Sequence, residues 1–451
     1  MLQAIKRFFG KNNGTDEPEI TTVPRDQHPI SRKQISENAL KVLYRLNKHD
    51  HEAYLVGGGV RDIMVGIQPK DFDIVTDATP EEVRALFRNS RIIGRRFKIV
   101  HVVFGREVIE VATFRAGAED AKERGEGDAH RRSDSGMLLR DNVYGTLEED
   151  IVRRDFTINA MYYTTHDFSL VTLAESLDDL DDRQIRMIGD PVQRYREDPV
   201  RMLRAVRFAA KLDFDIEPAT AAPIPKMADL LDNIPAARLF DDVLKLFMSG
   251  YGVRTYERLQ QYGLFRHLFP HTQASLDQDD SGHYERLILG ALKSTDERIE
   301  LGKSVTPAFI YAAFLWPVVE AQTEINLNSG TPPVPAQQQA IQEAISLQGQ
   351  RTSIPKRFQF TMRDIWELQP RLPNRQGNRA ERLVTHPKFR AAFDFLLLRE
   401  QAGADLDGLG QWWEDYQNAD DEQRQQMVSA LGGQRRRSSN RRPRRRNRPT
   451  L

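Results

Sequence analysis

The sequence predicts an α+β protein in which a small mixed sheet in the first half is followed by a second half made of helices alone. Short apolar strands, Gly-rich turns and amphipathic helices alternate as far as Ile216. Beyond that residue no strand pattern recurs, and helical periodicities are separated by breaks rich in Gly, Pro and Asn. A chain of 451 residues has room for about two to four domains.

The amino-terminal elements follow from local signals. Residues 1–30 combine glycine, prolines and charges, so we expect them to be disordered. A helix should start after Ser31, because apolar residues then recur with a period of 3.6. The apolar strand Ala53–Val56 ends in the triple-glycine turn Gly57–Gly59, and a short helix opens at Val60.

Two aspartates one position apart, Asp71 and Asp73, stand in the stretch Asp71–Thr76, which has strand character. Side chains at i and i+2 of a strand point to the same face. Both carboxylates should therefore emerge together, while Phe72 points into a core. Paired oxygen ligands suit Mg²⁺, which binds one or two carboxylates plus substrate phosphates. The alternative is a solvated strand end without a function.

The Gly-rich turn stands shortly before this pair. Glycines let backbone N–H groups approach a phosphate, and the start of a helix favours negative charge. Arg61 adds a cation to the same stretch. Together with the aspartates, these features predict phosphoryl or nucleotidyl transfer. Taken alone, the turn is as readily an ordinary one, since it is not the G-x-x-x-x-G-K-[ST] phosphate loop.

A third carboxylate, Glu110, lies on the predicted strand Glu107–Phe114. That strand should form a hairpin with Lys98–Phe104 across Gly105 and Arg106. The other residues on its face of the strand are mostly apolar. Two interpretations stay open: a charge on an edge strand that faces water, or a third acid beside the aspartates, acting as general base or metal ligand.

Two arginine-rich segments follow. In Arg153–Ala160 an acid and an apolar run follow two arginines, so at least one arginine should lie at the core boundary, where it can clamp a triphosphate. Later, a helix opens at Glu197–Arg201 and carries arginines at every third position: Arg201, Arg204 and Arg207. They form either a solvated stripe with a Glu197–Arg201 pair or donors for a nucleotide. Asp198 and Arg201 also suit a base edge, because one accepts hydrogen bonds and the other donates them.

The second half contains six segments with helical periodicity. They are Ala237–Met248, Glu285–Leu292, Pro307–Leu315, Ala336–Leu347, Phe360–Leu368 and Lys388–Leu398. We expect the helical region to end at Gly432 and Gly433 and a low-complexity tail to follow.

The formal net charge of zero hides an uneven distribution. Nine arginines and no acidic residue lie between Arg435 and Arg448, and removing them from the 65 basic residues leaves 56 against 65 acidic ones. A basic tail on an acidic body predicts a polyanionic partner. The tail arginines are Arg435, Arg436, Arg437, Arg441, Arg442, Arg444, Arg445, Arg446 and Arg448.

Cysteine is absent, which excludes disulfides and thiolate metal sites and fits a reducing interior. No apolar run approaches the ~18 residues that span a bilayer. The first fourteen residues are too short and too interrupted for a secretory signal. We therefore expect a cytoplasmic protein without a membrane span.

Four segments in this order resemble the class II nucleotidyltransferases, the family of bacterial poly(A) polymerases and tRNA CCA-adding enzymes. They are LVGGGVRD (Leu55–Asp62), Asp71-Phe72-Asp73, RRDFTINA (Arg153–Ala160) and EDPVRMLRAVRF (Glu197–Phe208). The resemblance is strongest from Ser31 to Leu212. It implies a polymerase-β-like head with a small mixed sheet, followed by an all-α neck, body and carboxy-terminal region.

The resemblance implies a division of the chain. We expect a disordered segment 1–30, a head 31–165, a neck 166–235, a body 236–330, a helical RNA-binding region 331–432 and a disordered arginine-rich tail 433–451.

The resemblance also implies roles for individual residues. Asp71 and Asp73 would bind two Mg²⁺ ions, Gly58 and Arg61 the triphosphate, and Arg154, Arg201 and Arg204 the nucleotide. Asp198 and Arg201 belong to the family's EDxxR element, which reads the incoming base in place of a template. Asp155 is commonly counted among the family's acidic active residues, so Glu110 and Asp155 both stay open as the third catalytic acid.

The stretch Ile92–Val102 looks like the one that marks the poly(A) polymerase branch, as do the lead-in Ile30–Lys48 and the basic tail. This implies template-free transfer of AMP from ATP to single-stranded RNA 3′ ends. RNA chaperone or RNA-decay proteins are possible partners. The alternative within the family is a tRNA CCA-adding enzyme. The alternative without catalysis is an RNA-binding protein whose transferase head has lost its activity.

Overall fold

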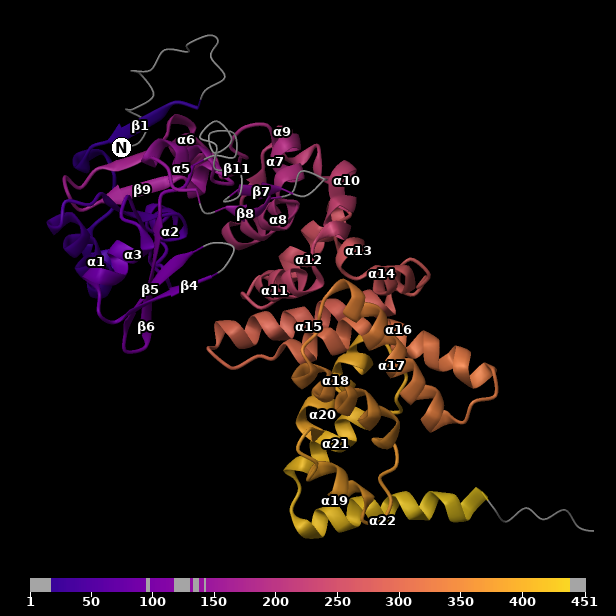
Figure 1. Ribbon diagram of the computed structural model, residues 1–451. Coiled ribbons are helices and arrows are strands. Elements are labelled where there is room, and N and C mark those ends of the chain that lie inside the picture. The colour runs from indigo at the N-terminus through magenta and orange to yellow at the C-terminus, as the bar shows by residue number, and fades with distance from the viewer. Residues whose placement is uncertain (1–17, 95–97, 117–129, 133–137, 142, 439–451) are drawn as a thin grey trace, which may run out of the picture. The chain divides into compact units, whose positions relative to one another are not determined.

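The computed structural model describes residues 18–94, 98–116, 130–132, 138–141 and 143–438. The chain divides into two units, Met1–Met227 and Ala228–Leu451. In Figure 1 the strands lie in the first unit, and the second is built from helices. The predicted α+β class and the change from mixed structure to helices after Ile216 are both confirmed for the described residues.

The described part of unit 1 contains a mixed sheet of eight strands in the order β1-β10-β9-β2-β3-β6-β5-β4. The pair β3 and β6 is parallel, and every other neighbouring pair is antiparallel. The strands are β1 (Ile20–Val23), β2 (Ala53–Val56), β3 (Asp73–Thr76), β4 (Ser90–Ile93), β5 (Ile99–Phe104), β6 (Glu107–Thr113), β9 (Met161–Thr164) and β10 (Leu170–Leu173).

Helices flank this sheet, and two short strand pairs complete the unit. Helix α1 packs on β2, β3 and β6, while α3 packs on β4, β5 and β6. The pairs are β7 (His130–Arg132) with β8 (Leu138–Asp141) and β11 (Gln184–Ile185) with β12 (Asp215–Ile216). The helices are α1 (Glu37–Lys48), α2 (Gly58–Met64), α3 (Pro80–Leu86), α5 (Leu147–Val152), α6 (Ala174–Asp181), α7 (Pro191–Glu197), α8 (Val200–Leu212), α9 (Pro218–Ala221) and α10 (Ile224–Met227).

Part of the segment expected to be disordered is ordered. Strand β1 pairs in antiparallel register with β10, and Ile30 is fully buried, so the prediction for residues 1–30 is wrong over Ile20–Ile30. Residues 1–17 lie outside the described residues. Strand β10 also extends the sheet past the head boundary expected at residue 165. The first difference arises because β1 is stabilised by a partner far away in the sequence, which a local pattern does not reveal.

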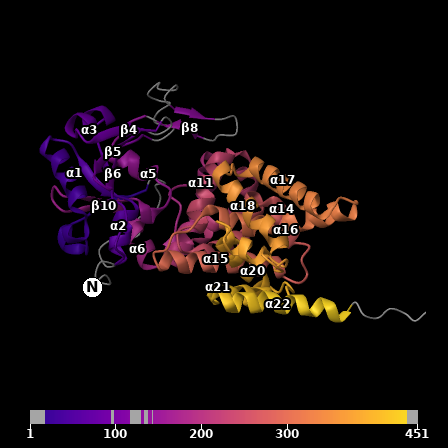
Figure 2. The ribbon, with the colours of Figure 1, turned by 90° about the horizontal axis from the view of Figure 1, so that it is seen from below.

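Unit 2 is helical throughout its described residues, as predicted. Its helices are α11 (Ala236–Phe247), α12 (Gly252–Gln261), α13 (Phe265–Leu268), α14 (Pro270–Leu276), α15 (His283–Glu300), α16 (Pro307–Asn328), α17 (Pro333–Arg351), α18 (Lys356–Leu368), α19 (Arg379–Val384), α20 (Phe389–Ala402), α21 (Leu409–Asn418) and α22 (Asp421–Ser438). Figure 2 shows α21 and α22 side by side, in agreement with their packing. None of the described helices is both long and apolar enough to cross a membrane.

The last helix corrects the boundary expected at residue 433. Helix α22 continues through Gly432 and Gly433 to Ser438. Two glycines lower helix stability by about 1 kcal/mol each, but the glutamine and arginines that follow are good helix formers. The tail beyond Ser438 lies outside the described residues.

Helix α5 begins with a capping box. The Thr146 hydroxyl accepts a hydrogen bond from the Glu149 N–H at 3.3 Å, and the Glu149 carboxylate accepts one from the Thr146 N–H at 2.7 Å. The helix packs on the buried cluster that includes Val75, Phe114 and Ile151. The cap therefore fixes the start of a helix that lies over the sheet.

We predict that Thr146→Ala increases amide hydrogen exchange in Leu147–Val152 about fivefold, because loss of an N-cap costs about 1 kcal/mol. Mass spectrometry of the full chain would measure this exchange. Thr146→Ser, which keeps the hydroxyl, is the matched control and should stay within about twofold of the parent protein. Unchanged protection of α5 in Thr146→Ala would contradict the prediction.

Candidate active site

Asp71 and Asp73 lie at the start of β3, with Asp71 just before the strand. Both residues are exposed, and Phe72 between them is buried. The predicted alternation is therefore confirmed. A Cβ atom added at Gly59 would lie 3.3 Å from the Asp71 carbonyl oxygen. Glycine thus lets α2 approach the aspartate pair closely.

Glu110 lies beside this pair. In the parallel pairing of β3 and β6, Glu110 is the register partner of Asp73, and both residues are exposed. Register partners present their side chains on the same face. Strand β6 lies between β3 and β5, so the interpretation of Glu110 as an edge-strand charge is wrong. The sheet brings three carboxylates to one face.

The electrostatics of Asp73 reflect this crowding. Protein atoms around the carboxyl restrict its hydration and raise its pKa, and the Glu110 and Asp71 charges raise it further, to about 6. Arg154 has the opposite effect. A cluster of like charges that raises a pKa is a site where a cation would be stabilised.

The donor set fits Mg²⁺. Carboxylate oxygens are the ligands this ion prefers, and it usually keeps several waters and binds substrate phosphates as well. Among the residues that the structure describes, no three His, Asp or Glu side chains form a complete protein cage. The Asp71 and Asp73 pair would hold such an ion only in part, which leaves positions for a substrate.

Arg154 is held against the sheet by a buried network. Its Nε donates to the Tyr162 hydroxyl at 2.7 Å and its Nη2 to Asp150 Oδ2 at 2.9 Å, while the Tyr162 hydroxyl donates to the same carboxylate at 2.7 Å. Burial alone would raise the pKa of Asp150, but Arg154 and Arg153 bring it below its usual value. The network places Arg154 next to the glycine turn, where its Nη1 would lie 3.6 Å from a Cβ at Gly57.

Asp155, the next residue, is engaged elsewhere. It accepts hydrogen bonds from Arg204 Nε at 2.6 Å, from Asn159 Nδ2 at 3.1 Å and from the Phe156 N–H at 2.9 Å. Burial opposes its ionisation, but Arg204 and these hydrogen bonds lower its pKa to about 2. Asp155 is thus a fully partnered anion, whereas Glu110 stands beside Asp73.

Arg61 belongs to the same buried network. Its side chain donates to Asp62 and to Asn159 Oδ1, and the residue is 1% exposed. The Asn159 amide therefore bridges Arg61 and Asp155, since its oxygen accepts from one and its nitrogen donates to the other. Gly58 lies close by: a Cβ there would be 3.5 Å from Arg61 Nη2.

The neck helices α7 and α8 join the site through arginines. Glu197 Oε2 accepts from Arg194 Nη1 at 3.1 Å and from Arg201 Nη1 at 3.0 Å, so the predicted Glu197–Arg201 pair exists. Arg194 also donates to the carbonyl oxygens of Arg153 and Arg154. Asp198 lies between the two helices, where its carbonyl accepts from the Arg201 N–H at 2.9 Å.

Sequence reasoning missed His101, Asn159 and Arg194. His101 Nε2 lies 3.2 Å from Glu110 Oε1 on the neighbouring strand. The predicted two-residue hairpin loop already fixes this pairing, because it sets residue 101 opposite residue 110. Asn159 and Arg194 bind partners on other elements, and no local pattern signals such contacts.

The expected RNA-binding arginines of the tail divide into two groups. Arg435, Arg436 and Arg437 fall in the last turns of α22, where only the backbone is described. Arg441, Arg442, Arg444, Arg445, Arg446 and Arg448 lie outside the described residues.

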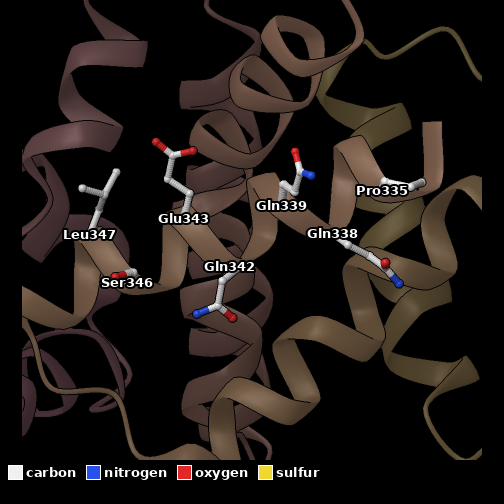
Figure 3. Close-up of a pocket in the computed structure, with 7 residues that line it drawn as sticks. All are labelled: Pro335, Gln338, Gln339, Gln342, Glu343, Ser346 and Leu347. Carbon is white, nitrogen blue, oxygen red and sulfur yellow. The ribbon is translucent and has the colours of Figure 1, made fainter. Parts of the chain in front are cut away.

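A surface hollow in unit 2 is lined by side chains of other kinds than those of the candidate active site. Figure 3 shows that its lining comes from helix α17 alone. The lining has amides and one carboxylate, so it lacks the paired acids of β3. The residues are Pro335, Gln338, Gln339, Gln342, Glu343, Ser346 and Leu347.

Three family models match the chain. "Poly A polymerase head domain" matches residues 53–186, "Probable RNA and SrmB-binding site of polymerase A" matches residues 213–276, and "Polymerase A arginine-rich C-terminus" matches residues 329–449. The head match contains the aspartate pair, Glu110 and the Arg153–Asp155 segment.

Relatives cover most of the chain. Poly(A) polymerase I of Salmonella typhimurium is 51% identical over 403 residues, which are 89% of this chain and 86% of that protein. A CCA-adding enzyme of Bacillus licheniformis is 36% identical over 230 residues, 51% of this chain and 55% of that protein. The solved structure of the Thermotoga maritima CCA-adding enzyme complexed with tRNA has a TM-score of 0.56 at 19% identity, covering 87% of this chain and 85% of that one, and shows the shared fold. The chain belongs to the poly(A) polymerase family of nucleotidyltransferases.

Proposed function

We propose that this protein transfers AMP from ATP to the 3′ ends of RNA without a template and releases pyrophosphate. The observation that carries this proposal is the carboxylate row of Asp71, Asp73 and Glu110 on one sheet face, with Arg154 beside it. Its Asp71 and Asp73 carboxylates would hold a divalent cation in part, and an adjacent arginine can hold a triphosphate. Family membership points to the same reaction.

In the proposed mechanism Asp71 and Asp73 are the residues that would hold two Mg²⁺ ions. When bound, Mg²⁺ would lower the pKa of the RNA 3′-hydroxyl and offset charge on the leaving pyrophosphate. Glu110 supplies the third carboxylate, since it is in register with Asp73, whereas Asp155 is paired with Arg204. We therefore assign Asp155 to holding the nucleotide-binding helix and Glu110 to the acidic cluster.

The arginines bind and orient the nucleotide. Arg154 lies next to the turn at Gly57 and is our candidate for the triphosphate. The resemblance assigns Arg61 to the triphosphate, but Arg61 is buried and donates to Asp62 and Asn159, so we propose instead that it stabilises this turn. On the neck side, Asp198, Arg201 and Arg204 would meet the incoming nucleotide. Positioning and electrostatics would then supply most of the acceleration.

The second candidate is a CCA-adding enzyme, which the fold alone also allows. The CCA-adding relative covers only half of this chain, whereas the poly(A) polymerase relative covers 89%. An extension assay separates the two. We expect a long ladder from ATP alone on a generic single-stranded RNA. Addition that stops after C, C and A, on a tRNA lacking its 3′ end, would overturn the proposal.

The substrate and location follow from the same proposal. Single-stranded RNA 3′ ends are the acceptor, held mainly through the backbone by unit 2 and the basic tail. RNA chaperone or RNA-decay proteins are the partners we propose. The cytoplasm is the compartment, which the lack of cysteine supports.

We predict that Asp71→Asn or Asp73→Asn lowers AMP incorporation about a thousandfold, because loss of a metal ligand removes several kcal/mol of transition-state stabilisation. RNA affinity should change by less than about threefold, since the carboxylate row does not hold the RNA backbone. Incorporation of labelled ATP and filter binding would measure the two quantities. Asp77→Asn is the matched control, an exposed aspartate just after β3 that pairs with His51. Full activity of either variant would exclude the metal site.

We predict that truncation after Ser438 weakens RNA binding and lowers its salt dependence. The cut keeps α22 and removes six arginines. Single-stranded nucleic acid contributes a slope of about 0.7 per neutralised phosphate, so log affinity against log salt should flatten by up to about four. Replacing the six arginines by lysine should preserve the slope. An unchanged slope after truncation would mean that the tail serves another partner.

A further inference from the structure

Three side chains form a row across three adjacent strands. Asp73 on β3 is in register with Glu110 on β6, and Glu110 is in register with His101 on β5. Register partners share a face of the sheet. The row therefore continues past the two carboxylates to an imidazole, which the proposed mechanism does not use.

Of the two ring nitrogens of His101, only Nε2 contacts a hydrogen-bond partner among the described residues. Its Nε2 lies 3.2 Å from Glu110 Oε1, and its Nδ1 is buried without a hydrogen-bond partner among the described residues. A carboxylate oxygen accepts hydrogen bonds, so Nε2 is the donor in this contact. The His101 side chain is 17% exposed and that of Glu110 is 50% exposed. The less exposed ring thus holds the more exposed carboxylate.

This contact restricts the rotation of the Glu110 side chain. Glu110 and Asp73 carry like charges and repel each other. A half-exposed glutamate without an anchor would rotate toward solvent, where its charge is hydrated and further from Asp73. His101 lies on the side of Glu110 away from Asp73, so its hydrogen bond keeps the Glu110 carboxylate over the sheet without bringing it closer to Asp73.

We propose that His101 is a positioning residue that orients Glu110 beside Asp73 for nucleotidyl transfer. This inference rests on the proposed function, because the orientation of Glu110 matters to the reaction only if the acidic row is the active site. His101 lies in the stretch Ile92–Val102, which the sequence singled out and the mechanism had left without a role.

Two substitutions at His101 test the proposal kinetically. His101→Leu removes the donor and should lower kcat about tenfold while KM for ATP stays within about twofold. His101→Gln places an amide N–H close to the position of Nε2 and should restore kcat to within about threefold of the parent enzyme. Arg91→Ala is the matched control: Arg91 is the exposed register partner of His101 on β4. Its kcat should not change.

A double-mutant cycle separates positioning from packing. In a Glu110→Gln background the charged acceptor is absent, so His101→Leu should cost less than about twofold. Losses that multiply, or a His101→Leu enzyme with full kcat, would overturn the inference. So would equal losses in His101→Leu and His101→Gln accompanied by equal drops in melting temperature, because they would indicate packing alone.

Nitrogen-15 NMR of the histidine-labelled full chain tests the contact without turnover. The spectrum of the parent protein should show His101 as the Nε2–H tautomer, and Glu110→Gln should shift that resonance. A resonance that Glu110→Gln leaves unchanged would overturn the inference. Failure of the parent enzyme to extend RNA would overturn the proposed function instead, and the NMR result would still decide whether Glu110 and His101 are bonded.

Discussion

The segment Arg153–Asp155 connects the sheet, helix α5 and the neck helices of unit 1 through its hydrogen bonds and ion pairs. Successive side chains are anchored in different directions: Arg154 binds Asp150 and Tyr162, and Asp155 binds Arg204. Arg194 donates to two carbonyl oxygens of the same segment. Asp150 and Asp155 are buried, so removing an arginine partner would leave a buried carboxylate uncompensated. This segment therefore holds the sheet, helix α5 and the neck helices in one geometry.

The acidic row works against stability. Asp73 has a pKa raised to about 6, so its charged form is less favourable in the folded protein than in the unfolded chain. The folded state binds the proton more tightly, and this unfavourable contribution is fully present above that pH. It disappears as the pH falls through 6 toward the ordinary carboxyl range. The nearby ion pairs Arg154–Asp150 and Arg204–Asp155 offset it.

Local chemistry was readable from the sequence, and long-range contact was not. The alternation at Asp71–Asp73 and the helical second half both follow from the periodicity of the sequence. Strand β1 depends on a partner strand more than a hundred residues away in the sequence. The bridging amide of Asn159 depends on Arg61, which is nearly a hundred residues away. The end of α22 was misplaced for a different reason, since helix-forming residues after Gly433 outweighed two unfavourable glycines. The placement of Glu110 needed the parallel pairing of β3 with β6.

The pairing of β1 with β10 has a consequence for biosynthesis. Val23 leaves the ribosome long before its partner Leu170 is made. At about 5–20 residues per second, the delay is roughly 7–30 s. During that time the strand has no neighbour in the sheet, and its unpaired backbone is open to other extended chains. Chaperone protection of the nascent amino terminus would be most valuable in this interval.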